Sequence, residues 1–195
     1  MDLNIELLKI KSNNVLPQKG RALIAEPLLP DFLFGRSVIL LTDDTRNAHA
    51  GLILNHHSGM KVGEVMSDFE NTNAELYIGG PVENDVLFWL HQYGDMIHGS
   101  KRIFGSVYLG GDYEQMVELY KHGFITDDKI KFFIGYSGWD FGQLKSELNE
   151  NSWLVTDVDD HFVFSDANNL WERSLGYAGS RYDIWKNFPE DPEWN

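Results

Sequence analysis

Cysteine is absent from this chain of 195 residues. The absence excludes disulfide bonds, thiolate metal sites and cysteine nucleophiles, and it is typical of proteins in a reducing compartment. Long apolar runs are lacking as well, since no stretch approaches the roughly 18 consecutive apolar residues that predict a transmembrane helix. The first residues carry acids where a secretory signal has a basic segment. We therefore expect a cytoplasmic protein that does not insert into membranes.

Basic residues are few, with 16 Lys and Arg against 30 Asp and Glu and a formal net charge of −14. Nowhere do three basic residues follow one another. Nucleic-acid binding draws most of its affinity from Lys and Arg placed on phosphates. The composition therefore disfavours direct nucleic-acid binding and binding to an anionic membrane, and it favours a solubilising acidic surface.

Recognisable metal and cofactor motifs are also lacking. The adjacent His56 and His57 would point to opposite faces of a strand end, and no His-Glu-x-x-His motif exists. The acidic segment 157–161 lacks the loop pattern of an EF-hand. The turn at residues 79–81 has neither the Lys-Ser/Thr of a phosphate loop nor the glycine spacing of a dinucleotide fold. We expect neither a metal nor a cofactor.

The apolar pattern predicts one α+β domain. Residues 38–41 are continuously apolar, which predicts a strand covered on both faces. The predicted strands follow one another in hairpin-like pairs, the last of them 153–156 with 161–164, and this favours a mixed, largely antiparallel sheet. The clearest helices are 112–122 and 141–149, the second with Phe141, Leu144 and Leu148 as its buried face. No repeat or long linker divides residues 1–195.

Two terminal additions flank this domain. Residues 3–10 predict a short amphipathic helix. The C-terminal region adds two short helices and a tail whose Trp185, Phe188 and Trp194 can dock on the domain or on a second copy of the chain. The second arrangement would make a homodimer.

The segment 135–139, Gly-Tyr-Ser-Gly-Trp, lies between a predicted strand and a predicted helix. That context invites comparison with the nucleophile elbow Gly-x-Ser-x-Gly, but Trp139 stands where a small residue is needed. Asp157 and His161 lie too close together to complete a triad. We interpret the segment as a tight turn whose glycines permit φ > 0.

A candidate cleft borders the two glycine turns. Gln143 and Glu147 are spaced i, i+4 and share one helix face. Beside Tyr136 and Trp139 they would supply an aromatic wall, an amide and a carboxylate, although the same pair also suits a solvated helix edge. The candidate contacts are Asn55, Gly79, Gly80, Tyr136, Trp139, Gln143 and Glu147.

Several motifs, taken in order, resemble the AlgH/YqgE family over about residues 20–176. They are residues 20–27, 34–41 and 51–55, then Gly79-Gly80-Pro81-Val82 with Leu90-His91, and finally 135–139 followed by Gly142-Gln143-Leu144, Glu147-Leu148, Asn151 and Trp153. The resemblance implies a bifurcated, barrel-like sheet flanked by helices, in a bacterial and largely uncharacterised family. One branch is named for an effect on transcription of exopolysaccharide genes. No DNA-binding motif or catalytic residue comes with the resemblance.

Three functional hypotheses follow. The leading one is a non-enzymatic binding or regulatory protein that takes an unknown protein or small-molecule partner. The second is an enzyme of unknown reaction, with Glu147 or His91 as general base. The third is a transcriptional regulator that acts directly on DNA, which the net charge disfavours.

Overall fold

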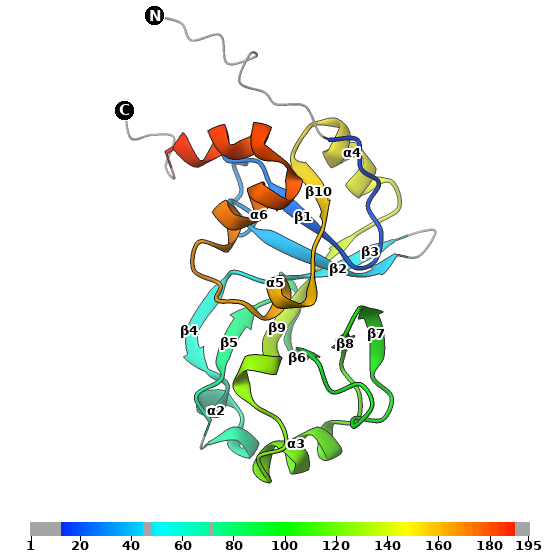
Figure 1. Ribbon diagram of the computed structural model, residues 1–195, viewed down its shortest axis with the longest axis vertical. Coiled ribbons are helices and arrows are strands. Elements are labelled where there is room, and N and C mark those ends of the chain that lie inside the picture. Colours follow the sequence, from blue (N-terminus) through cyan, green and yellow to red (C-terminus); the bar gives the residue numbers. More distant parts are fainter. Residues whose placement is uncertain (1–12, 45–47, 71, 190–195) are drawn as a thin grey trace, which may run out of the picture.

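The computed structural model describes residues 13–44, 48–70 and 72–189 (Figure 1). The predicted helix at 3–10 and Trp194 lie outside the described residues. The strands are β1 (Arg21–Ala25), β2 (Val38–Asp44), β3 (His49–Ile53), β4 (His57–Lys61), β5 (Glu75–Ile78), β6 (Val82–His91), β7 (Lys101–Phe104), β8 (Val107–Leu109), β9 (Ile130–Trp139) and β10 (Trp153–Asp157). The α-helices are α2 (Val62–Val65), α3 (Tyr113–Lys121), α4 (Gln143–Asn149), α5 (Asp160–Phe164) and α6 (Leu170–Ala178), and the 3-10 helices are η1 (Ser67–Phe69), η2 (Asp127–Lys129) and η3 (Ser180–Asn187).

The strands form one branched sheet whose main path runs β10-β1-β2-β3-β9-β6-β8-β7. A side branch leaves β9 through β5 to β4. The pairing of β5 with β9 is parallel and the others are antiparallel, which confirms the mixed, largely antiparallel prediction. Sheets of this kind grow mainly from hairpins, as the paired strand pattern indicated.

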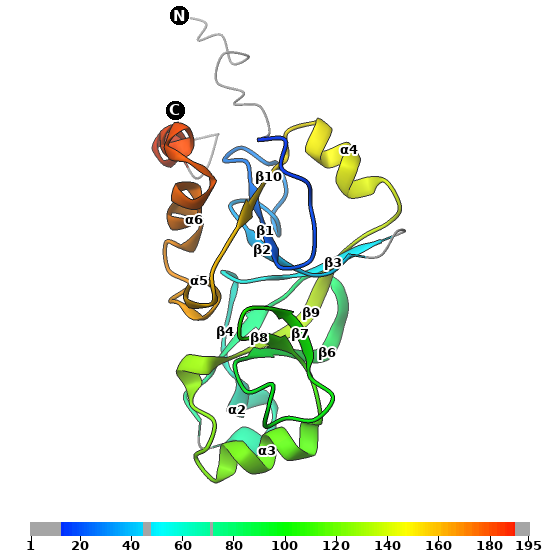
Figure 2. The same cartoon turned by 45° about the vertical axis from the view of Figure 1, so that its right-hand side comes forward.

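The sheet forks along β9. Residues 137–139 pair with β3, whereas residues 132–134 pair with β5 on one side and residues 130–134 pair with β6 on the other. Figures 1 and 2 show the consequence, an upper lobe around β1, β2, β3 and β10 and a lower lobe around β4 to β8, with β9 running from one to the other. The segment 135–139 is therefore not the predicted tight turn. It continues β9, a strand that serves both lobes, and of its two glycines Gly135 alone has a positive φ (69°).

The strands of the upper lobe are covered on both faces. Val38 and Leu40 of β2 pack into a cluster with α5, α6 and η3, while Ile39 and Leu41 pack on the opposite side with Leu144 of α4. Figure 2 shows the two helical layers on either side of the strands. A strand buried on both faces has no polar side to alternate with, which explains the continuous apolar run at 38–41.

Two predicted elements differ from the structure. Residues 161–164 do not form a strand; they belong to helix α5, because the Asp159 carboxylate accepts a hydrogen bond from the Phe162 N–H (2.7 Å) and caps a helix there. The strand partner of β10 is instead β1. The other difference concerns Phe141, which is 80% exposed, since α4 begins only at Gln143 after Gly142 at φ 79°.

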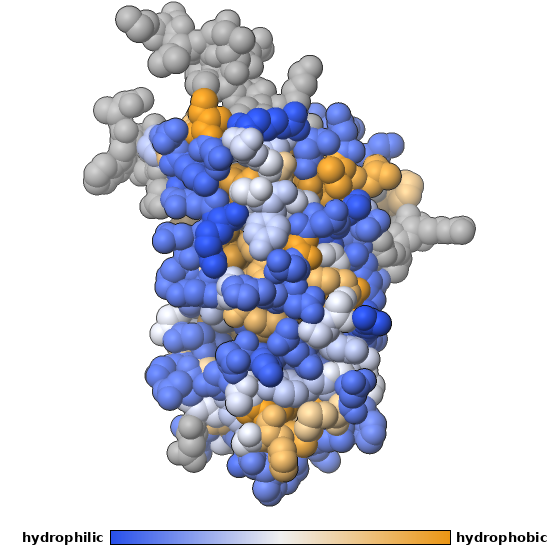
Figure 3. Space-filling view, in the orientation of Figure 1, coloured by the Kyte–Doolittle hydropathy of each residue, from blue (hydrophilic) through white to orange (hydrophobic). Residues whose placement is uncertain are grey.

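The described part of the C-terminal tail docks on its own domain. Trp185 is buried and Phe188 is partly buried against the cluster that includes α6. A homodimer through the tail stays a prediction. The outer surface in Figure 3 is predominantly hydrophilic with apolar residues interspersed, in keeping with the charged composition. None of the helices in the described part of the chain has the length and apolar character needed to cross a membrane.

Candidate functional site

The two glycine segments, 79–81 and 135–139, pack directly against each other. The Gly79 N–H donates to the Ile134 carbonyl (2.8 Å), and the Gly79 carbonyl accepts from the Ser137 hydroxyl (3.0 Å). A Cβ on Gly79 would lie 2.2 Å from the Gly135 carbonyl oxygen, and one on Gly80 would lie 2.2 Å from the backbone of Tyr136. Both glycines are needed because two backbones approach too closely for side chains. Ser137 is buried and bonded at this junction, so its hydroxyl has a structural role.

A hollow of about 340 Å³ lies where β3 meets the end of β9; we refer to it as the aromatic hollow. Three predicted cleft residues line it together, namely Tyr136, Trp139 and Gln143. Its full lining is Asp43, Ala48, His49, Ala50, Val82, Tyr136, Gly138, Trp139, Asp140 and Gln143. The predicted grouping of an aromatic wall with an amide is thus present, and two carboxylates and a histidine complete it.

Glu147 lies behind this hollow and does not line it. One oxygen, Oε2, accepts hydrogen bonds from the indole N–H groups of Trp139 (2.8 Å) and Trp153 (2.7 Å). The other oxygen accepts from the Gln143 amide (3.0 Å). The two indoles meet edge to face, with ring centroids 6.1 Å apart. The carboxylate therefore orients the aromatic wall, because ionised acceptors make strong bonds to buried donors.

Asn55 lies elsewhere and joins two chain segments. Its carbonyl oxygen accepts from the Val38 N–H (2.8 Å) and its amide donates to the Arg36 carbonyl (3.0 Å). It lines a different depression, beside His57 and residues 167–172. The structure therefore does not bring Asn55 together with Tyr136 and Trp139 in the aromatic hollow.

His91, the other candidate general base, is fully buried in the lower lobe. Its Nε2 lies 2.8 Å from the Gly110 carbonyl, and its Nδ1 accepts from the Tyr93 N–H (3.0 Å). Burial lowers the pKa of His91, and the hydrogen bond to Gly110 opposes this only in part. The ring therefore ties loops together, and both its nitrogens are bonded within the protein.

His49 is a site residue that the sequence analysis missed. It opens β3 and lines both the aromatic hollow and a second, larger hollow of about 650 Å³. The Nδ1 atom of His49 is buried and has no hydrogen-bond partner among the described residues. An unpartnered buried nitrogen is uncommon, since most buried polar atoms are paired. No motif surrounds His49, so no local pattern distinguished it from the other histidines.

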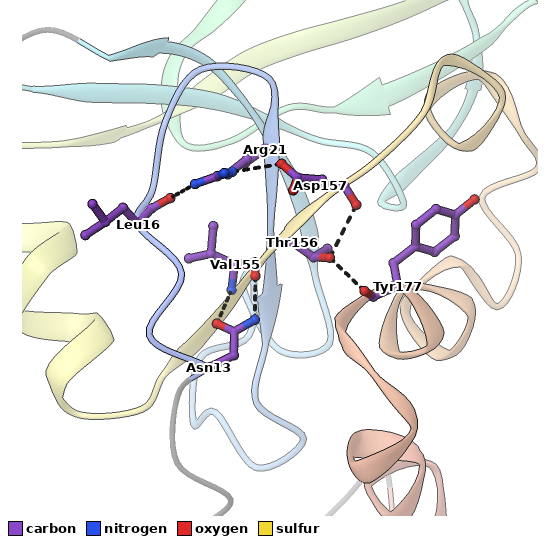
Figure 4. A network of polar contacts seen from close by, with 7 residues as sticks. All are labelled: Asn13, Leu16, Arg21, Val155, Thr156, Asp157 and Tyr177. Carbon is purple, nitrogen blue, oxygen red and sulfur yellow. Dashed lines mark hydrogen bonds and ion pairs between the residues drawn. The ribbon is translucent and has the colours of Figure 1, made fainter.

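The larger hollow lies between α4 and the segment 14–17, which is held beside β10 (Figure 4). The Asn13 side chain bonds both backbone groups of Val155, accepting at 3.3 Å and donating at 2.6 Å. Arg21 bonds the Asp157 carboxylate (2.8 Å) and the Leu16 carbonyl (2.7 Å). These contacts hold one wall of the hollow in place.

Lys131 is a second residue that the sequence analysis missed, although it is the only charge in the apolar run 130–134. It lies in β9 and is 6% exposed, which is rare for a lysine. It lines a hollow of about 360 Å³ between β5 and the chain that joins α5 to α6. Among the described residues there is no group of three or more His, Asp or Glu side chains placed to hold a metal ion.

Comparison with known proteins agrees with this architecture. The sequence profile of a family described as AlgH-like matches residues 22–183. UPF0301 proteins of Bacteroides thetaiotaomicron and Bacteroides fragilis are 41% and 38% identical over 197 residues, covering 100% of this chain and of each relative. The crystal structure of protein DIP2367 from Corynebacterium diphtheriae superposes with a TM-score of 0.75 at 22% identity, covering 96% of this chain and 100% of that one. The solution structure of the AlgH protein from Pseudomonas aeruginosa superposes with a TM-score of 0.71 at 24% identity, covering 92% and 98%.

Proposed function

The chain belongs to the AlgH-like family, and we propose that it is a non-enzymatic, cytoplasmic binding protein whose partner inserts a side chain into the aromatic hollow. The observation that carries the proposal is the hollow that Tyr136 and Trp139 wall together with His49, a residue whose buried Nδ1 has no hydrogen-bond partner among the described residues.

The charges around the hollow indicate the chemistry of the partner. Asp43 and Asp140 line it, and the chain carries a net charge of −14. A basic side chain of a partner protein would find two carboxylates and an aromatic face, which together favour Lys or Arg. The overall negative field would also speed the approach of a basic partner. We therefore propose a basic segment of another protein as the occupant.

The alternatives have weaker support. Glu147 and His91 direct their polar atoms at protein donors and acceptors, so neither offers a base to a substrate in the aromatic hollow. The excess of acidic residues disfavours direct binding to DNA. An effect on transcription would then arise through a bound protein, which makes a regulatory role compatible with this proposal.

Titration with short peptides tests the proposal. We expect acetylated, amidated tripeptides centred on Arg or Lys to shift the NMR signals of Tyr136 and of the Trp139 indole N–H, whereas glutamate-centred peptides leave them in place. The double variant Asp43→Asn with Asp140→Asn should weaken the shifts several-fold. Asp128→Asn is the matched control, because Asp128 is exposed, lies in η2 and has no bonded partner among the described residues. Shifts that scatter over the surface, or that persist in the double variant, would sink the proposal.

A further inference from the structure

The bonding of Lys131 is incomplete for a charged amine. Its Nζ donates one hydrogen bond to the Ser165 carbonyl (2.9 Å) and lies 4.9 Å from the centroid of the Tyr77 ring. These are its only polar or ring contacts among the described residues. An ammonium group has three N–H donors, so a buried one normally gathers several acceptors. The site thus suits a neutral amine better than a charged one.

The surroundings of Lys131 also favour the neutral form of its amine. Burial lowers the pKa of Lys131 to about 8, and nearby Arg173 adds to the decrease while Asp166 opposes it. At pH 7.5 roughly a quarter of the Lys131 amine would be neutral, compared with about one part in a thousand for an ordinary lysine. Neutral amines are the nucleophilic form, and buried lysines that form Schiff bases depend on such a decrease.

The hollow beside Lys131 has room for a small molecule and a mixed set of polar groups. Its volume is about 360 Å³, and its lining includes Tyr77, His57, Asp166 and Asn168. Burial raises the pKa of Tyr77 to about 12, so its phenol keeps its proton and can donate a hydrogen bond. Asp166 stays ionised, because hydrogen bonds from Asn168 hold its pKa below the ordinary value. Carboxylates on the rim disfavour an anionic ligand, so the site favours an uncharged, hydroxylated one.

We propose that Lys131 is a carbonyl-binding amine that forms a reversible imine with small, uncharged hydroxyaldehydes or hydroxyketones. The nitrogen lone pair forms a bond to the carbonyl carbon, the C=O π bond breaks, and one proton passes from the nitrogen to the oxygen, which gives a carbinolamine. Loss of water then forms the C=N bond, and the amine and the carbonyl compound yield imine and water without any change in oxidation state. The Asp166 carboxylate favours the iminium that forms when this nitrogen is protonated.

This site is separate from the aromatic hollow, since the two hollows share no lining residue. The lower-lobe strands β5 and β9 and the α5–α6 connection build it, at the level where the two lobes meet in Figure 1. Failure of peptide binding at Tyr136 and failure of carbonyl capture at Lys131 are therefore independent results.

Reductive trapping on the intact chain tests the proposal. Glycolaldehyde and sodium cyanoborohydride are added briefly at pH 7.5, and peptide mass spectrometry measures the modified fraction of each lysine. We expect Lys131 to react at least about tenfold faster than Lys145, an exposed lysine of α4 without a bonded partner among the described residues. The same comparison in urea should abolish the preference.

The pH profile provides the second readout. The preference for Lys131 should shrink as the pH rises from 8 to 10, because Lys131 has already lost its proton whereas ordinary lysines still gain neutral amine. A ratio of rates is used because it cancels the pH dependence of the reduction step. Lys131→Met, checked for folding by circular dichroism, should lose this adduct and keep the others. A Lys131 that reacts no faster than Lys145 at pH 7.5, or that follows the same pH profile, overturns the proposal.

Discussion

Removing the Glu147 carboxylate should destabilise the protein far more than removing another carboxylate from the same region. Glu147→Ala leaves the indole N–H groups of Trp139 and Trp153, which are 4% and 2% exposed, without the acceptor that they share. A buried donor left without a partner costs about 1–3 kcal/mol. Glu147 is itself half-buried, so water can enter part of the vacated space. We therefore expect a loss of about 3 kcal/mol in the free energy of unfolding.

Urea unfolding followed by tryptophan fluorescence measures this loss, with the near-UV circular dichroism of the indoles as a second probe. Glu147→Gln should lose less, about 1–2 kcal/mol, because a carboxamide oxygen can still accept from both indoles. Its NH₂ group would then face the Gln143 amide, whose orientation is set by a bond from the Asp140 N–H (3.1 Å). Two donors facing each other explain why the substitution is not neutral.

Glu150→Ala is the matched control for these variants. Glu150 is exposed and its side chain accepts one bond, from the Ser146 hydroxyl (3.1 Å), so its loss should cost no more than about 0.5 kcal/mol. If Glu147→Ala is no more destabilising than Glu150→Ala, or leaves the near-UV spectrum unchanged, the carboxylate does not orient the aromatic wall.

Three further predictions test other parts of the structure by urea unfolding. Gly79→Ala should lower the free energy of unfolding by about 3 kcal/mol or more, because its Cβ would meet the Gly135 carbonyl oxygen. Gly176→Ala, in α6, has open space around its Cβ and should raise the free energy of unfolding by about 0.5–1 kcal/mol. Equal effects would contradict the close approach of Gly79 to Gly135. Burial lowers the pKa of His91, so below about pH 6.5 the unfolded chain binds a proton at this residue more readily than the folded protein does. Stability should therefore drop in acid, and His91→Gln should reduce the drop. An identical pH dependence of stability in the variant and the natural protein would refute this. Between pH 8 and pH 10.5 the unfolded chain holds the Lys131 proton that the folded protein has released, so the contribution of Lys131 to stability should rise by about 3 kcal/mol. The difference between the pH profiles of the natural protein and Lys131→Met measures this contribution, because tyrosines with raised pKa, such as Tyr77, oppose the rise in both proteins. Parallel profiles would show that burial does not lower the pKa of Lys131.

The fold class could be predicted because its signals are local. The apolar run 38–41 shows within four residues that the strand is covered on both faces, and the structure places α6 and η3 on one face and α4 on the other. The prediction of a hairpin between 153–156 and 161–164 was wrong because a strand distant in the sequence pairs with 153–156. Residues on either side of the acidic loop suit strands equally well, and the pairing of β10 with β1, about 130 residues away along the chain, decided between the alternatives.

The candidate cleft was predicted only in part. Tyr136, Trp139 and Gln143 lie within eight residues of one another, so the helix that follows the strand brings them to one hollow. Asn55 was assigned to the same cleft without any local link, and the structure places it beside other elements. The hypothesis that the cleft binds a partner stays a prediction.

The sequence alone determines the lack of thiol chemistry, the acidic character and the covered strand at 38–41, because these depend on residue type and on short segments. The roles of His49, Glu147 and Lys131 depend on their surroundings in the folded chain. The bond from Lys131 to Ser165 spans 34 residues, and the close approach of Gly79 to Gly135, which requires glycine at position 79, spans more. Burial and hydrogen-bond partners set whether a side chain is charged, bonded or open to a ligand, and folding determines both through such distant contacts.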